Sequence, residues 1–246
     1  MTESDNAEPH DLANPHEYDH RHANVSSGWL RASVFGAMDG LVSNIGLIAG
    51  IAAAGAPASI VVVTGISGLL AGGISMALGE YTSVRTQNEQ LLVEVQTERD
   101  ALGRNPVGEQ AELTAMFESL GMQPETATQA AGQVHANTEH ALKVHLAHEL
   151  GLSPEEQPSP MVAAISSFVA FSVGAVIPVL PYFFGFGTLW WGLLFGGVGL
   201  LAAGFAAAKF TDRNPFAGAG RQLLFGGIAV AATYGIGRLL GVSSIG

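Results

Sequence analysis

The sequence predicts an all-α, multi-pass membrane protein with five transmembrane helices and a helical cytosolic insert between the second and the third. Three observations predict this fold class. Hydrophobic residues make up 48% of the 246 residues, and charged residues only 13%, about half the usual share. The charged residues are gathered in blocks, which leaves long apolar stretches between them. Nowhere does the alternation of apolar and polar residues that is typical of strands occur.

The apolar stretches are too long for helices of a soluble core. Between residues 32 and 79 the only charged residue is Asp39, and residues 161–208 and 222–237 contain none. An apolar run of about 18 residues or more with almost no charge is typical of a membrane span. The sequence therefore predicts spans at about Ala32–Ala54, Ser59–Val84, Val162–Phe184, Thr188–Phe210 and Ala217–Leu240.

Basic residues predict the orientation. Nine of the 10 Lys and Arg residues lie in the N-terminal tail, in the insert, or between the fourth span and the start of the fifth; Arg238 is the exception. The turns at 55–58 and 185–187 contain none. The positive-inside rule then places the N-terminus and the insert in the cytoplasm and the C-terminus outside. The composition, rich in Ala and Gly, favours a bacterial plasma membrane.

The chain divides into four segments by composition. Residues 1–28 contain acids and four histidines but no apolar run, so they are expected to be a disordered cytoplasmic tail and not a signal peptide. Residues 29–84 hold the first two spans, residues 85–160 form the cytosolic insert, and residues 161–246 hold the last three spans.

The insert is predicted to be a small helical domain. The helix of the second span continues through polar sequence to Gly103 and Pro106, because its apolar residues keep a helical spacing. The next helix ends at Gly121, and Pro124 suits the first turn of the one after it. Asn137 is a suitable N-cap for a last helix.

Asp39 is the most informative polar residue. It lies about a third of the way into the first span, where a carboxylate costs about 3 kcal/mol to insert. No Lys, Arg or His lies in the interior of a predicted span to neutralise it. A cation from outside the chain, either a proton or a metal ion, is therefore the expected partner. The alternative is a structural Asp that is hydrogen-bonded to Ser43 or Asn44.

Met76 and Glu80 form a second polar pair, four residues apart on the second span. A thioether and a carboxylate on one helix face offer a mixed soft and hard site for a divalent transition metal ion. The alternative is a packing role for Met76 and a solvated position for Glu80 at the membrane edge.

The insert is rich in acids at helical spacing, among them the pair Glu109 and Glu112, and Glu98 on the preceding helix. His145 and Glu149 are a further pair, four residues apart. Carboxylates and imidazoles without thiolates suit Fe(II), Mn(II), Co(II) or Zn(II) better than copper(I). The alternative is the solvated face of a small helical domain.

Composition also excludes several classes of function. The absence of Cys excludes disulfides, iron–sulfur clusters and Cys nucleophiles. No nucleophile elbow, zinc-protease motif or P-loop occurs, so we expect neither an enzyme nor a prosthetic group. A net charge of −11 with only 10 basic residues argues against a nucleic-acid partner.

Taken together, these residues resemble the vacuolar iron transporter family over almost the whole chain after the tail. Three segments carry the resemblance: Asp-Gly-Leu-Val-Ser-Asn at 39–44, Ser-Met-Ala-Leu-Gly-Glu-Tyr-Thr-Ser at 75–83, and Gly-Ala-Val-Ile-Pro-Val-Leu-Pro-Tyr at 174–182. The glycine-rich last span and the five-span plan with a helical insert match as well.

The resemblance implies a homodimer in the lipid bilayer that exports Fe(II), and often Mn(II) or related ions, from the cytosol in exchange for protons. It implies metal ligands at the dimer interface, at the positions of Asp39, Met76 and Glu80. It also implies glutamate ligands in the soluble domain, at the positions of Glu98, Glu109, Glu112 and Glu149.

Two positions depart from the family pattern. Ala101 stands where the family has a further Glu, and His145-Leu146 stands where it has a Met pair. We therefore expect His145 to bind an ion together with Glu149; the alternative is a solvated helix His with no ligand role.

The preferred function is a proton-coupled exporter of divalent metal. One alternative is a membrane-anchored metal sensor, although an anchor needs no carboxylate at the depth of Asp39. The other is a transporter of a different solute, which leaves the acid-rich insert without a role.

Overall fold

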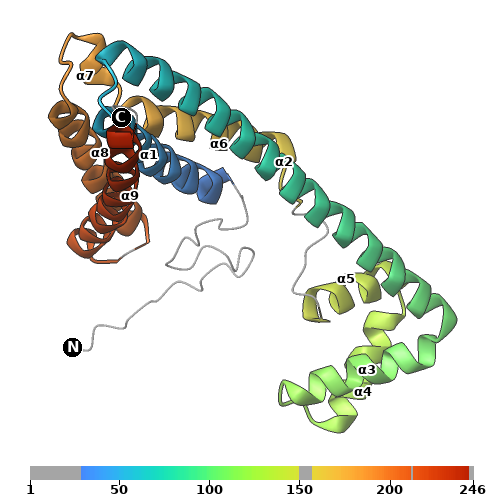
Figure 1. Ribbon diagram of the computed structural model, residues 1–246. Coiled ribbons are helices and arrows are strands. Elements are labelled where there is room, and N and C mark those ends of the chain that lie inside the picture. The colour runs from blue at the N-terminus through green and yellow to red at the C-terminus, as the bar shows by residue number, and fades with distance from the viewer. Residues whose placement is uncertain (1–28, 150–156, 212, 244–246) are drawn as a thin grey trace, which may run out of the picture.

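The computed structural model describes residues 29–149, 157–211 and 213–243, and all regular structure in these ranges is helical. The helices are α1 (Trp29–Ala53), α2 (Ala58–Arg104), α3 (Pro106–Ser119), α4 (Pro124–His135), α5 (Thr138–Glu149), α6 (Pro160–Val176), α7 (Leu180–Phe183), α8 (Leu189–Phe210) and α9 (Pro215–Ser243). Figure 1 shows two parts: a bundle of α1, α6–α9 and the first half of α2, and a cluster of α3–α5 at the far end of α2.

Helix α2 joins the two parts without a break. Its 47 residues span about 70 Å at 1.5 Å per residue. The first half is apolar, and the polar second half keeps Val84, Leu91 and Leu102 buried. The helix ends before Asn105, whose side chain accepts a hydrogen bond from the Gly108 amide and caps α3. The prediction that the second span continues as one helix into the insert is confirmed.

Small residues allow α1 to lie at the centre of the bundle, against α2, α6, α8 and α9. A Cβ on Gly40 would collide with the carbonyl oxygen of Phe171, and one on Gly174 with that of Ala37. Because neither position has a side chain, the backbones of α1 and α6 approach closely, as is typical of membrane helices.

The third predicted span, 162–184, is not one continuous helix. Helix α6 ends at Val176. Pro178 lies between α6 and the four-residue α7, and Pro181 lies in the first turn of α7. A proline has no amide hydrogen and disfavours a helical residue before it. The expectation of one helix to Phe184 was wrong, because the apolar composition predicts a span but the two prolines interrupt its helix.

The break leaves the Ala175 carbonyl available to accept a hydrogen bond from α1. The Val179 amide donates to the Val176 carbonyl, not to that of Ala175 as it would in a continuous α-helix. The Asn44 side chain donates instead to the carbonyls of Ala175, at 2.5 Å, and Gly65 on α2, at 3.2 Å. One buried amide of α1 thus holds α2 and α6 in place, a turn beyond Asp39.

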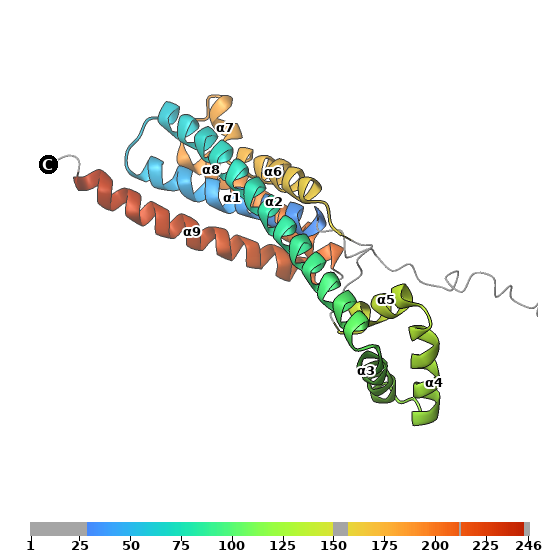
Figure 2. The ribbon, with the colours of Figure 1, turned by 90° about the vertical axis from the view of Figure 1, so that its right-hand side faces the viewer.

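The connections gather at the two ends of the bundle (Figure 2). Gly241 near the end of α9 packs against Ala54, and Gly187 packs against Ala58, so the α1–α2 turn, the loop before α8 and the end of α9 share one end. The starts of α1 and α9 and the end of α8 lie at the other end, from which α2 continues toward α3–α5.

The cluster of α3–α5 has its own small core. Leu102 of α2 packs there against Leu142 and Leu146 of α5. Gly121 adopts a φ of 97° after α3, and Asn137 accepts hydrogen bonds from the amides of residues 139 and 140 at 3.0 and 3.2 Å. The predicted end of a helix before Gly121, the predicted start at Pro124 and the predicted Asn137 cap are confirmed.

Four helices, α1, α2, α8 and α9, are long and apolar enough to cross a membrane. Helix α6 is apolar but has only 17 residues, about 26 Å. The fold is that of an all-helical membrane protein.

Candidate metal sites

Asp39, Met76 and Glu80 line one cleft of about 340 Å³ between α1 and α2. Asp39 lies one turn after Phe35 on α1, and Met76 lies one turn before Glu80 on α2, so each helix presents one face to the cleft. The structure thus brings together the three membrane residues that the sequence singles out.

A hydrogen bond holds the Asp39 carboxylate in this cleft. The Ser43 hydroxyl donates to its Oδ1 at 2.7 Å, whereas Asn44 is turned toward α2 and α6. Among the residues that the structure describes, no basic side chain forms an ion pair with Asp39. Its carboxylate can therefore accept a cation from outside the chain.

Glu80 is not a solvated residue. Its side chain is only 9% exposed, and its Oε2 lies 2.8 Å from Nη2 of Arg31 in the first turn of α1. A buried carboxylate needs such a partner to offset its loss of hydration. The two residues are 49 positions apart, so no local pattern predicts this pair. Asp39 lies eight residues after Arg31, about 12 Å further along the helix.

The cleft opens at the surface of the chain. Phe35, Ser75 and Gly79, which line it, are all exposed. A Cβ added to Gly79 would meet no atom within 4 Å. One chain therefore supplies three candidate ligand atoms, two oxygens and a sulfur, and leaves the other side of the cleft uncovered.

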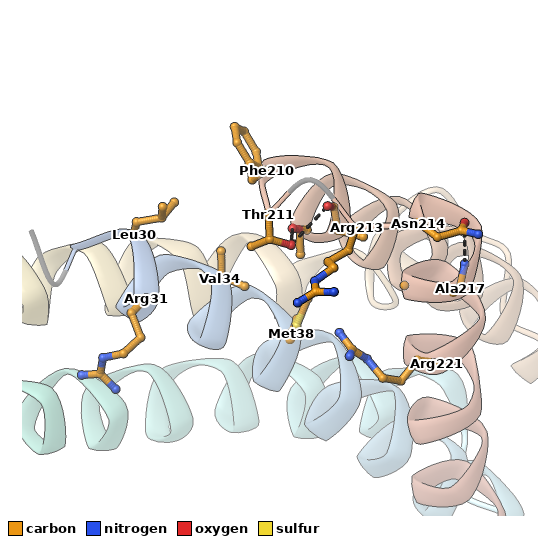
Figure 3. Close-up of a pocket in the computed structure, with 13 residues that line it drawn as sticks. Leu30, Arg31, Val34, Met38, Phe210, Thr211, Arg213, Asn214, Ala217 and Arg221 are labelled. Atoms are coloured by element: carbon orange, nitrogen blue, oxygen red, sulfur yellow. Dashed lines mark hydrogen bonds between the residues drawn. The ribbon is translucent and has the colours of Figure 1, made fainter. Parts of the chain in front are cut away.

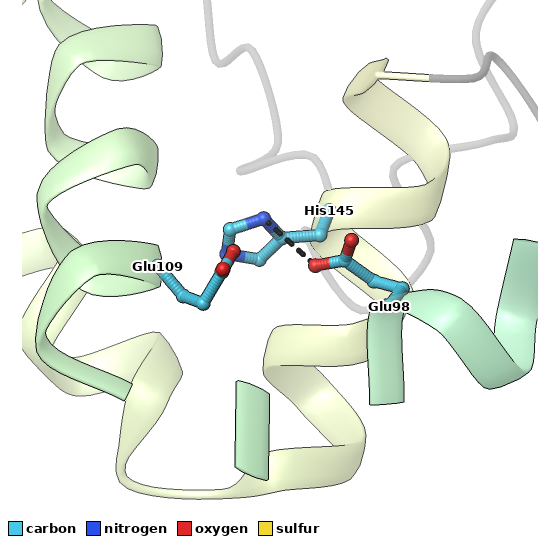
Figure 4. A group of neighbouring side chains, drawn as sticks. All are labelled: Glu98, Glu109 and His145. Atoms are coloured by element: carbon cyan, nitrogen blue, oxygen red, sulfur yellow. Dashed lines mark ion pairs between the residues drawn. The ribbon is translucent and has the colours of Figure 1, made fainter. Parts of the chain in front are cut away.

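A second group of candidate ligands lies in the insert (Figure 4). Glu98 of α2, Glu109 of α3 and His145 of α5 each offer one ligand atom, and these atoms lie within 4.8 Å of one another. His145 is fully buried, and its Nδ1 lies 3.3 Å from Oε1 of Glu98. Three helices thus converge on one site with two carboxylates and an imidazole.

His135 at the end of α4 lies beside this group, although no ligand spacing in the sequence selects it. Its Nε2 lies 3.1 Å from Nε2 of His145. Burial and the neighbouring imidazole lower the pKa of His135, and Glu109 opposes this only in part. A neutral imidazole can offer a lone pair to a metal ion. The short turn around Asn137, which folds α5 back against α4, is the only signal for this proximity.

Two residues implied by the resemblance, Glu112 and Glu149, are not part of this group as the structure describes it. Glu112 is exposed on α3 and does not belong to the group of Glu98, Glu109 and His145. The side chain of Glu149 lies outside the described residues, as does the histidine-containing tail. The expected pair of His145 and Glu149 therefore stays a prediction.

Comparison with known proteins gives one consistent result. Residues 30–238 match the model of the VIT family. A "Vacuolar iron transporter" of Acanthamoeba castellanii is 34% identical over 229 residues, which cover 89% of this chain and 82% of the relative. "Vacuolar iron transporter 1" of Eucalyptus grandis is 30% identical, with 89% and 90% covered, and that of Arabidopsis thaliana is 29% identical, with 86% of both chains covered. The chain belongs to the VIT family.

Proposed function

We propose that this protein transports iron, as Fe(II), across a membrane, and that the ion passes through the cleft of Asp39, Met76 and Glu80. The observation that carries the proposal is the convergence of these three side chains within an apolar bundle. The names of the relatives, which are iron transporters, support the same substrate.

The ligand chemistry supports a transition metal ion. Mg²⁺ and Ca²⁺ prefer sites made of oxygen alone. A thioether beside two carboxylates instead suits ions of intermediate softness, such as Fe(II), Co(II) and Zn(II), and it tolerates Mn(II). We therefore extend the proposed substrates from Fe(II) to these related ions.

The proposed topology has five crossings, with α6 and the segment through α7 together forming the third. Helix α6 is about 26 Å long, a little short of the ~30 Å hydrocarbon core, and residues 177–183 supply the remaining depth. With the basic end of the bundle in the cytoplasm, the insert is cytosolic and α9 ends outside. The composition favours a bacterial plasma membrane, although the relatives are named for the vacuole.

We further propose that the working unit is a homodimer. A second copy would cover the open side of the cleft and supply the additional ligands that a divalent ion needs. Leu92 and Val93, 56% and 62% exposed, lie on the polar half of α2, where lipid tails do not reach. A partner that covers them would remove this apolar surface from water.

Protons are the proposed coupling ion, and the direction is export from the cytosol. An ionised Asp39 in an apolar bundle is costly without a cation, so a proton that replaces the departing metal ion lowers that cost. The insert group of Glu98, Glu109 and His145 lies on the proposed cytosolic side, where it can gather ions for the cleft.

Uptake into proteoliposomes under an imposed pH gradient tests this function. We expect Fe(II) to enter vesicles with an acidic lumen while protons leave the lumen in exchange. Vesicles without protein should show neither flux. Glu118→Gln, which removes an exposed carboxylate of α3, is the matched control and should transport normally. Metal binding without flux would instead favour a membrane-anchored sensor.

A further inference from the structure

A larger pocket of about 860 Å³ lies where the start of α1, the end of α8 and the start of α9 meet (Figure 3). It shares no lining residue with the metal cleft, which lies between α1 and α2. Nothing in the proposed transport mechanism uses it. Its position is the basic end of the bundle, next to the boundary of the apolar segments.

Two guanidinium groups converge in this pocket. Figure 3 shows Arg213, from the α8–α9 connection, and Arg221, from the second turn of α9, both reaching toward Met38 of α1. Among the residues that the structure describes, neither forms an ion pair with a carboxylate. Two like charges in one pocket repel each other. An anion between them would offset this repulsion, because it attracts both guanidinium groups.

The third arginine of the lining has a different role. Arg31 is turned away from the other two in Figure 3, and its guanidinium pairs with Glu80 at 2.8 Å. It is therefore left out of the anion site, and the positive charge of the pocket rests on Arg213 and Arg221.

The polar side chains of Asn214 and Thr211 near the pocket already form hydrogen bonds. The Asn214 side chain accepts hydrogen bonds from the amides of Phe216 and Ala217 at the start of α9. The Thr211 hydroxyl donates to carbonyls of the last turn of α8. An anion bound here would be held by the two guanidinium groups, which match a phosphate in planar, two-pronged geometry.

Apart from the arginines, Thr211 and Asn214, the lining is apolar, and it lies next to the boundary of the apolar segments. Leu30 and Val34 of α1 and Phe210 of α8 form much of it. Phe210 and Phe216 are 76% and 80% exposed at this end of the bundle. Exposed apolar side chains beside arginines suit the boundary between lipid tails and head groups, because an arginine near a helix end can extend its charge to the head groups.

We propose that this pocket binds one anionic phospholipid. The phosphate of its head group lies between Arg213 and Arg221, and its acyl chains run along Leu30, Val34 and Phe210. A soluble phosphate would use the two arginines but would leave the apolar walls in contact with water. The combined charge and apolar lining therefore select a lipid and not a free anion.

Native mass spectrometry of the purified full-length protein in a neutral detergent measures this directly. The probes are phosphatidylglycerol and phosphatidylcholine with the same acyl chains, and inorganic phosphate. We expect one tightly bound phosphatidylglycerol per chain and at least fivefold weaker binding of phosphatidylcholine. Arg213→Gln and Arg221→Gln should each weaken phosphatidylglycerol binding by about fivefold, and the double variant by roughly 25-fold.

Arg238→Gln is the matched control, because it removes an arginine from the same helix at the opposite end of the bundle. It should bind the lipid as the wild type does, and the single variants carry the test if the double variant does not fold. Equal binding of the two lipids, full displacement by millimolar inorganic phosphate, or equal losses in Arg238→Gln and Arg221→Gln would each overturn the proposal.

Discussion

The membrane cleft and the insert group use the same kinds of ligand in different surroundings. The cleft combines the carboxylates of Asp39 and Glu80 with a thioether, and it lies among apolar helices. The insert group combines the carboxylates of Glu98 and Glu109 with an imidazole, on helices rich in exposed polar residues. Helix α2 contributes to both, and 18 residues, about 27 Å of helix, separate Glu80 from Glu98.

The surroundings decide how much each ligand matters. In the cleft, few waters or neighbouring groups can take the place of a lost carboxylate, so an ion there depends on each carboxylate. In the insert, water and the many nearby acids can complete the coordination of an ion. We therefore expect all-or-none effects on transport when the Asp39 carboxylate of the cleft is removed, and graded effects on affinity in the insert.

The largest effect is expected for Asp39→Ala. The variant should lose metal transport by about 100-fold or more, because the cleft loses the ligand that has no cation of the chain beside it. Size-exclusion chromatography and thermal unfolding should show a folded protein of unchanged oligomeric state. An unfolded variant would mean that Asp39 is needed for folding and not for transport.

The next effect is on metal binding by the insert. Glu98→Gln should weaken the tightest binding of Co(II) to the full-length protein by about 10-fold, because the group loses the carboxylate that lies 3.3 Å from the His145 imidazole. Isothermal titration gives the affinity.

Glu112→Gln is the matched control for this effect. Glu112 is exposed and does not belong to the described group, so we expect a change of less than about twofold, within what an exposed charge contributes. An equal or larger loss in this variant would favour the ligand set implied by the family resemblance.

Met76→Ala should change selectivity more than total transport. We expect Fe(II) and Co(II) uptake to fall by about fivefold relative to Mn(II), because a thioether favours softer ions. Competition between ions in proteoliposomes measures the ratio. A uniform loss for all ions would mean that Met76 acts through packing, and Met116→Ala in α3 is the control.

The smallest effect concerns the ion pair of Arg31 and Glu80. Arg31→Gln should lower stability without metal by about 1–2 kcal/mol, a discounted figure because Arg31 is 63% exposed. That corresponds to a melting temperature lower by about 2–8 °C. Added Co(II) should stabilise the variant more than the wild type, since the ion no longer competes with a guanidinium for Glu80. Identical stabilisation of the variant and the wild type by Co(II) would mean that Glu80 does not bind the metal ion.

Features set by local sequence were predictable. The continuity of α2, the start of α4 at Pro124 and the cap at Asn137 follow from spacing and capping within a few residues. The pair of Met76 and Glu80 follows from one helical turn. The break before Pro178 was also present in the sequence, but the apolar composition around it masked its effect.

Features set by tertiary packing were not predictable. Arg31 and Glu80 meet only because α1 and α2 lie side by side, and His135 meets His145 only because α5 folds back against α4. The exclusion of Glu112 from the insert group depends on the rotation of α3, which the one-turn spacing from Glu109 does not fix.

One measurement separates the two regions most directly: Fe(II) flux at saturating metal in proteoliposomes that contain Asp39→Asn or Glu98→Gln. Asn keeps the shape of the side chain but removes its charge, so we expect no flux above empty vesicles from Asp39→Asn. We expect near-wild-type flux from Glu98→Gln, because saturating metal bypasses a weakened gathering site. Normal flux in Asp39→Asn would contradict the assignment of the cleft as the transport path.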